Sequence, residues 1–158
     1  MTTLPPENVL DFPRPAICEA WPHRVEIDFA GRTIASTTDA WRALETYHPP
    51  TYYLPRGAFA PGVLVPNGRR SLCEWKGQAS YFDIVVDGRT APGAAWCYER
   101  PTPSFAPIAG MVAVYAEPMD ECRVAGVRVI PQPGNFYGGW VTPNITGPVK
   151  GAPGTTHW

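Results

Sequence analysis

The sequence lacks the signatures of the common catalytic and metal-binding folds. It contains no G-x-S-x-G nucleophile turn, no phosphate-binding P-loop, no dinucleotide glycine fingerprint and no H-E-x-x-H zinc motif. Its four cysteines form no C-x-x-C pair, and no histidine lies at zinc-finger spacing from them. The sequence therefore predicts no metal site and no cofactor, and it excludes the enzyme classes that these motifs define.

An excess of charge of either sign is also missing. Lys and Arg total 13 against 14 Asp and Glu, with no basic stripe, so we expect no nucleic-acid partner. The first residues show no secretory signal, and no apolar run reaches the length of a membrane span, so we expect no membrane partner. A cytoplasmic protein with reduced cysteines is the expectation that follows. The sequence is compatible with a homodimer.

Proline, glycine and aromatic residues are abundant instead. The chain of 158 residues has 20 prolines and 15 glycines, and 12% of its residues are aromatic. A hydrophobic content of 44% is too high for a disordered chain, so the composition predicts a compact, turn-rich β protein. We expect a single β-rich domain over residues 23–158, preceded by an extended, Pro-rich N-terminal arm over residues 1–22.

Alternation of apolar and polar residues predicts antiparallel strands. Val25, Ile27 and Phe29 fall on one side of a predicted strand that ends at an Ala30-Gly31 turn. An Asp87-Gly88 pair marks a second hairpin, because both residue types tolerate the backbone of a tight two-residue turn. Short strands and glycine turns continue along the chain, so the predicted fold is mainly β, with antiparallel sheets.

One segment predicts a helix. The run S-T-T-D-A-W-R-A-L-E-T-Y-H places Trp41 and Leu44 on one side at helical spacing. Asp39 near its start suits the positive end of a helix dipole. His48 is followed by two prolines, and a residue before proline avoids the helical region. We therefore expect one short helix near residues 38–48.

The stretch P-Q-P-G-N-F-Y-G-G-W-V-T, residues 131–142, combines bare backbone with large rings. It is too rich in glycine and proline for a helix and too aromatic for an ordinary solvated loop. Gly138 and Gly139 leave backbone N–H groups uncovered beside the rings of Tyr137 and Trp140. This mixture favours the wall of a ligand pocket. A bulged strand that fills the core with rings is the alternative.

Further rings for such a pocket come from two predicted strands. In A-A-W-C-Y, two rings share a face beside small alanines, which leave room for either a ligand or a second sheet. In S-L-C-E-W-K-G, another tryptophan precedes a predicted Lys76-Gly77 turn. The predicted ligand-binding residues are Trp75, Trp96, Tyr98, Tyr137, Gly138, Gly139 and Trp140.

A thiol-based site is a second interpretation. Lys76 at the predicted turn could bring a cation near Cys73 and lower the pKa of its thiol. Glu45 lies three residues before His48, and a carboxylate at that spacing can orient an imidazole that acts as a base. The predicted catalytic set is therefore Cys73, Lys76, His48 and Glu45. The structural alternatives are a buried cysteine that packs as a small hydrophobe and a histidine at a helix end.

Five motifs also carry a family resemblance: H-P-P-T-Y-Y, S-L-C-E-W-K-G-Q-A-S-Y, A-A-W-C-Y-E-R-P, P-Q-P-G-N-F-Y-G-G-W-V-T and G-P-V-K-G-A-P-G-T. In their order and spacing they resemble the bacterial and fungal family known as domain of unknown function 427, over nearly the whole chain from Val25 to Trp158. The resemblance implies a β-tent, or Mss4-like, fold of antiparallel sheets that meet at an angle. Relatives of that architecture include B-type methionine sulfoxide reductases and the cereblon ligand-binding domain. The zinc-binding C-x-x-C pairs of those relatives are missing here, and no motif maps their catalytic thiol onto Cys73.

Three functional hypotheses follow. The first is a small-molecule-binding domain with an aromatic pocket, which requires a concave site with rings at its wall. The second is a thiol-dependent enzyme that uses Cys73 as nucleophile or redox centre, which requires an accessible and ionised thiol. The third is an interaction module with no pocket, whose rings all lie in the core.

Overall fold

β-strands make up most of the chain, and nearly all of them pair antiparallel. The computed structural model describes residues 4–14, 16–73, 76–132, 138–147 and 149, and of Cys73 the backbone alone. The strands are β1 (Glu7–Asn8), β2 (Ile17–Trp21), β3 (Val25–Phe29), β4 (Arg32–Thr37), β5 (Ala40–Glu45), β6 (His48–Tyr53), β7 (Leu64–Cys73), β8 (Gly77–Val86), β9 (Arg89–Cys97), β10 (Val112–Val114), β11 (Glu121–Val124), β12 (Val127–Arg128), β13 (Ile130–Pro131), β14 (Trp140–Val141) and β15 (Ile145–Thr146). Three short 3-10 helices are η1 (Val9–Asp11), η2 (Arg56–Ala58) and η3 (Pro103–Ile108).

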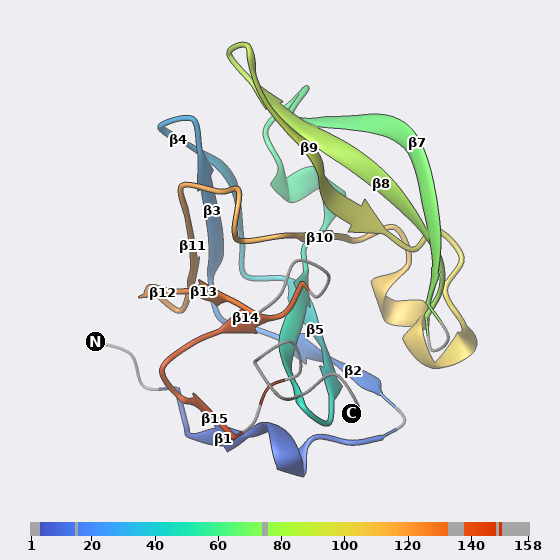
Figure 1. Ribbon diagram of the computed structural model, residues 1–158, viewed down its shortest axis with the longest axis vertical. Helices are drawn as coiled ribbons and strands as arrows, with labels where there is room; N and C mark the ends of the chain where they lie inside the picture. Colours follow the sequence, from blue (N-terminus) through green and yellow to red (C-terminus); the bar gives the residue numbers. More distant parts are fainter. Residues whose placement is uncertain (1–3, 15, 74–75, 133–137, 148, 150–158) are drawn as a thin grey trace.

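Three sheets form the body of the fold. One has the strand order β10-β9-β8-β7, a second β12-β11-β3-β4 and a third β2-β5-β6. Figure 1 shows the β3, β4 and β11 strands on one side and the long β7, β8 and β9 strands on the other, with clearly different directions. The β13-β14 pair lies near the middle of the view, and β1 pairs in parallel with β15. This mainly β arrangement of antiparallel sheets confirms the predicted fold class and is consistent with a β-tent-like domain.

Tight glycine turns set the hairpins where the sequence predicts them. Ala30-Gly31 joins β3 to β4 with φ of 53° and 76°, and Asp87-Gly88 joins β8 to β9 with φ of 48° and 83°. Two successive residues with positive φ give the turn a twist that matches that of the flanking strands. The Lys76-Gly77 turn is placed differently, because Gly77 is already the first residue of β8 and pairs with Cys73.

The predicted helix near residues 38–48 is wrong. The segment forms β5 and the start of β6, which pair through Glu45 and His48 across a short turn that contains Tyr47 with a φ of 71°. β5 is the central strand of its sheet, and β2 and β6 supply hydrogen bonds on both sides. Pairing with two neighbours outweighs a helical preference of a few tenths of a kcal/mol per residue.

Contacts of a buried arginine also favour the strand over the predicted helix. Arg42 on β5 is 5% exposed. Its guanidinium donates to Glu7 at 2.7 and 2.9 Å and to Glu19 at 2.6 Å, and it lies 4.3 Å from the Trp21 ring centroid. Residues before the expected boundary at position 22 thus pair with the rest of the chain, through β2 against β5 and through these two ion pairs.

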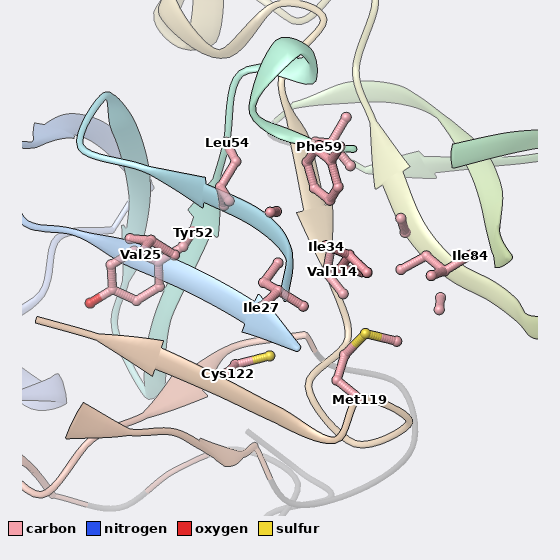
Figure 2. Packing of buried hydrophobic residues seen from close by; sticks show 14 of the residues in the cluster. Val25, Ile27, Ile34, Tyr52, Leu54, Phe59, Ile84, Val114, Met119 and Cys122 are labelled. Carbon is pink, nitrogen blue, oxygen red and sulfur yellow. The ribbon is translucent and has the colours of Figure 1, made fainter. Parts of the chain in front are cut away.

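The main core lies where the sheets face each other. Figure 2 shows Ile27 of β3 near Val114 of β10, with Ile84 of β8 on the far side and Val25 farther along β3 next to Tyr52. Ile27 and Ile84 are fully buried. Complete burial of an aliphatic side chain contributes about 1.5–3 kcal/mol, so this shared core holds the sheets together. Among the described residues, no helix is long and apolar enough to cross a membrane.

Candidate ligand-binding pocket

A pocket of about 510 Å³ opens between the β7-β8-β9 face and a wall that contains Pro131, Gln132, Gly138 and Gly139. Its described lining consists of Arg69, Ser71, Tyr81, Pro92, Gly93, Ala94, Tyr115, Ala116, Glu117, Pro118, Pro131, Gln132, Gly138 and Gly139. The volume lies within the range of about 300–1,000 Å³ usual for small-molecule sites. A second hollow beside Arg32 and Asp87 has about 160 Å³ and falls below that range.

The sheet side of the pocket carries hydroxyl groups and a cation. The Tyr81 hydroxyl on β8 and the Ser71 hydroxyl on β7 lie 2.8 Å apart, within hydrogen-bonding distance. The Arg69 guanidinium lies 5.2 Å from the Tyr81 ring centroid, close enough for a cation–π contact. These three side chains come from adjacent antiparallel strands, so the β7-β8 pairing brings them together.

Gly93 allows the arginine to lie close to the β9 backbone. A Cβ at Gly93 would come 2.8 Å from Arg69 Nη1, and its φ of 59° is unfavourable for other residues. The Gly93 N–H donates to Asp83 Oδ1 at 2.8 Å, and Asn67 donates to the same oxygen at 2.9 Å. The Asn67 and Gly93 hydrogen bonds hold the pKa of the Asp83 carboxyl below its ordinary value, and Arg69 lowers it further.

The opposite wall is held by a buried glutamine. Gln132 is 3% exposed. Its backbone N–H donates to the Gly139 carbonyl at 3.0 Å, and its Oε1 accepts from the Gly139 N–H at 3.1 Å. Its Nε2 lies 3.1 Å from His48 Nδ1. Because Oε1 accepts, Nε2 is the donor, so Nδ1 accepts and the ring proton sits on Nε2. This chain of bonds connects β6 to the pocket wall.

Gly138 packs directly against Trp96. A Cβ at Gly138 would come 2.1 Å from Trp96 Cη2, so no residue with a side chain fits there without a shift. The Trp96 ring in turn lies 4.6 Å, centroid to centroid, from the ring of Tyr115. Burial is the main cause that raises the pKa of Tyr115, so its hydroxyl keeps its proton at neutral pH. The rings of Trp96 and Tyr115 therefore lie behind the pocket wall at Gly138.

The predicted ligand-binding residues divide into three groups. Gly138 and Gly139 line the pocket, and Trp96 lies beneath Gly138. Tyr98 and Trp140 are not among the lining residues, and both are buried. Trp75 and Tyr137 lie outside the described residues.

Trp140 belongs to the core. It is 1% exposed, its Nε1–H donates to the Val114 carbonyl at 2.9 Å, and its ring lies 5.5 Å from that of Tyr52. Tyr98 packs in another cluster, 6.3 Å from the ring of Tyr53. These two rings stabilise the scaffold around the pocket.

The predicted catalytic residues Glu45, His48 and Cys73 lie on β5, β6 and β7, and Lys76 lies in the turn just before β8. Glu45 Oε1 and His48 Nε2 face each other at 4.0 Å across the β5-β6 turn, a contact set by strand pairing. Lys76 Nζ lies 5.6 Å from the Phe105 ring centroid. The Cys73 backbone pairs with Gly77, and its side chain lies outside the described part of the chain.

The other cysteines are poor nucleophiles in the folded state. Burial raises the pKa of Cys97 to about 11 and that of Cys122 to about 12, and burial also raises the pKa of Cys18. Cys97 Sγ lies 3.3 Å from Glu99 Oε1 and 3.4 Å from Arg56 Nη2, and the nearby carboxylate adds to the increase. At neutral pH these thiols are therefore protonated.

Several lining residues carry no local signal in the sequence. Arg69, Ser71 and Tyr81 meet only because β7 pairs with β8, and nothing in their own neighbourhood marks that register. Gln132 sits between two prolines in the Gly-rich stretch. A polar residue between two prolines, in the same stretch as the Gly138-Gly139 pair, was its only distinguishing feature in the sequence.

The fold and the pocket define a mainly β domain with a candidate ligand site on one sheet face. The chain belongs to the family described as domain of unknown function (DUF427), whose model matches residues 17–125. The matched region contains the sheet wall of the pocket, whereas Gln132, Gly138 and Gly139 follow it. No curated protein matches the chain.

Proposed function

We propose that this chain is a small-molecule-binding domain and that its ligand occupies the pocket between the β7-β8-β9 face and the wall that contains Gln132, Gly138 and Gly139. The observation that carries the proposal is the pocket of about 510 Å³ with Gly138 and Gly139 in its wall. A cavity of this size suits a ligand of modest molecular weight.

The chemistry of the lining supports the same proposal. Prolines, alanines and tyrosine rings supply apolar surface, while Arg69, Ser71 and Gln132 supply polar atoms at separate points. Apolar surface of this kind gives affinity, and the placed polar groups give orientation and specificity.

The wall is also preorganised. Gln132 holds Gly139 by hydrogen bonds at 3.0 and 3.1 Å and reaches His48 on the other side. A wall that is already ordered loses little conformational entropy when a ligand arrives, which favours affinity. In this proposal His48 positions the wall through Gln132.

A fragment screen monitored by two-dimensional ¹H–¹⁵N NMR tests the proposal. Fragments that bind should shift the amide signals of Gly93, Ala116, Gly138 and Gly139 together, in a saturable manner. The amide of Gly62, which lines the smaller hollow, is the internal control and should stay in place. Fragments that shift only signals outside the pocket, or no binding fragments at all, would contradict the proposal.

A further inference from the structure

The described lining of the pocket carries one basic and one acidic side chain, and their identity bears on the chemistry of the ligand. Arg69 is the only Lys or Arg among the described lining residues, and Glu117 is the only Asp or Glu. No salt bridge to Arg69 occurs within the described part of the chain, where the ion pairs join other residues. Arg69 lines the pocket, and among the described residues it interacts electrostatically with the Asp83 carboxylate, which acts on it without a salt bridge.

Arg69 is held in place by its surroundings. Its backbone N–H donates to Asn67 Oδ1 at 2.9 Å, and its side chain lies between the Tyr81 ring and the Gly93 backbone. The nearby Asp83 uses one oxygen for both Asn67 and Gly93. The Tyr81 and Gly93 contacts limit the positions of the exposed guanidinium, and its planar fork can bind an oxyanion through two parallel hydrogen bonds.

A hydroxyl proton is available beside this cation. Ser71 and Tyr81 share one hydrogen bond between their hydroxyl groups, and each hydroxyl carries one proton. Their mutual bond uses one of these two protons, so the other can be donated to an acceptor in the pocket. Arg69 and this pair together form a site for a negatively charged oxygen group.

We propose that the pocket binds a small monocarboxylate whose carboxylate pairs with Arg69 and whose flat apolar part lies toward Tyr115 and Gly138. This inference rests on the proposed function and specifies the class of ligand. A single negative charge is favoured because Glu117 also lines the pocket and repels a dianion such as a phosphate monoester more strongly than a monoanion.

Matched probes test the charge requirement. Benzoate and indole-3-carboxylate carry the carboxylate, benzamide and indole-3-carboxamide are their neutral counterparts, and phenyl phosphate is the dianion. In NMR titrations of the full chain we expect the carboxylates to bind at least about tenfold more tightly than their amides, with shifts at Gly93 and Gly138. Phenyl phosphate should bind more weakly than benzoate.

Two variants assign the effect to Arg69. Arg69→Gln should weaken carboxylate binding by about tenfold or more and leave amide binding unchanged. Arg70→Gln removes the same charge from the next residue of β7, which does not line the pocket, and should change carboxylate binding less than about twofold. A dispersed spectrum of each variant confirms that it folds.

The possible results separate this inference from the proposed function. If amides and carboxylates bind in the pocket equally well, or if Arg69→Gln weakens neither, the carboxylate inference is overturned while small-molecule binding stands. Tighter binding of phenyl phosphate than of benzoate also overturns it, in favour of a phosphate ligand. If neither the carboxylates nor any neutral fragment shifts the pocket amides, both proposals fail.

Discussion

Gly138→Ala should destabilise the fold by overpacking at the pocket wall. The new Cβ would lie 2.1 Å from Trp96 Cη2, 3.0 Å from Cζ2 and 3.1 Å from Cζ3. Real Cβ contacts are much longer, so either the wall or the ring must move. The Trp96 ring is only 7% exposed and packs against Tyr115, so it has little room to turn away.

The expected cost is about 1–3 kcal/mol, the usual range for inserting a methyl group into packed surroundings. For a domain of this length, each kcal/mol lowers Tm by about 2–4 °C. Gly138 does not have positive φ, so the cost is steric and not a backbone effect. The affinity for pocket ligands should fall as well, because displacement of the wall changes the shape of the cavity.

Gly57→Ala is the matched control, since a Cβ at Gly57 would meet nothing within 4 Å and its φ is not positive. Urea unfolding and thermal denaturation of both variants give the two free energies of unfolding. We expect Gly57→Ala to remain close to the wild type. A Gly138→Ala variant as stable as that control would refute the close packing of the wall on Trp96.

Three further predictions concern the scaffold. Trp140→Phe should cost at least about 1–3 kcal/mol in urea unfolding, because the Val114 carbonyl loses its buried donor; an unchanged midpoint would contradict this. Arg42→Met should lower the free energy of unfolding by at most about 3–5 kcal/mol, because Glu7 and Glu19 lose their partner while Glu19, 43% exposed, keeps contact with water. A variant that is more stable than the wild type in the same assay would contradict this. Burial raises the pKa of Tyr52 to about 12 from 10.0, so its contribution to stability should be complete below pH 10 and fall toward pH 12. Tyr52→Phe should make the decline in unfolding free energy above pH 10 less steep, and an identical slope would contradict the argument.

Local patterns in the sequence predicted the strands and turns well. The alternation of Val25, Ile27 and Phe29 and the Asp87-Gly88 turn are confirmed, because each depends on residues that are neighbours in the chain. The helix near residues 38–48 failed for the opposite reason. Arg42 meets Glu7 and Glu19, which lie 35 and 23 residues away, and no local pattern shows such partners.

Of the two walls of the pocket, the sequence predicted only the one that contains Gly138 and Gly139. Gly138 and Gly139 carry a visible signal because bare backbone beside rings is unusual, and both line the pocket. The sequence also predicted Tyr98 and Trp140 as pocket rings, yet both are buried in the core. The type of ring does not indicate which face of a sheet another element covers. Arg69 depended on strand register, which long-range pairing sets.

The most direct test of the central claim is to fill the pocket and measure binding. Ala116→Leu adds three carbons at the pocket lining, and Ala106→Leu makes the same change at an exposed position of η3 outside that lining. Isothermal titration of the best fragment should give at least about a tenfold loss of affinity for Ala116→Leu and no loss for Ala106→Leu. Equal affinity of the wild type and both variants would contradict the assignment of this pocket as the binding site.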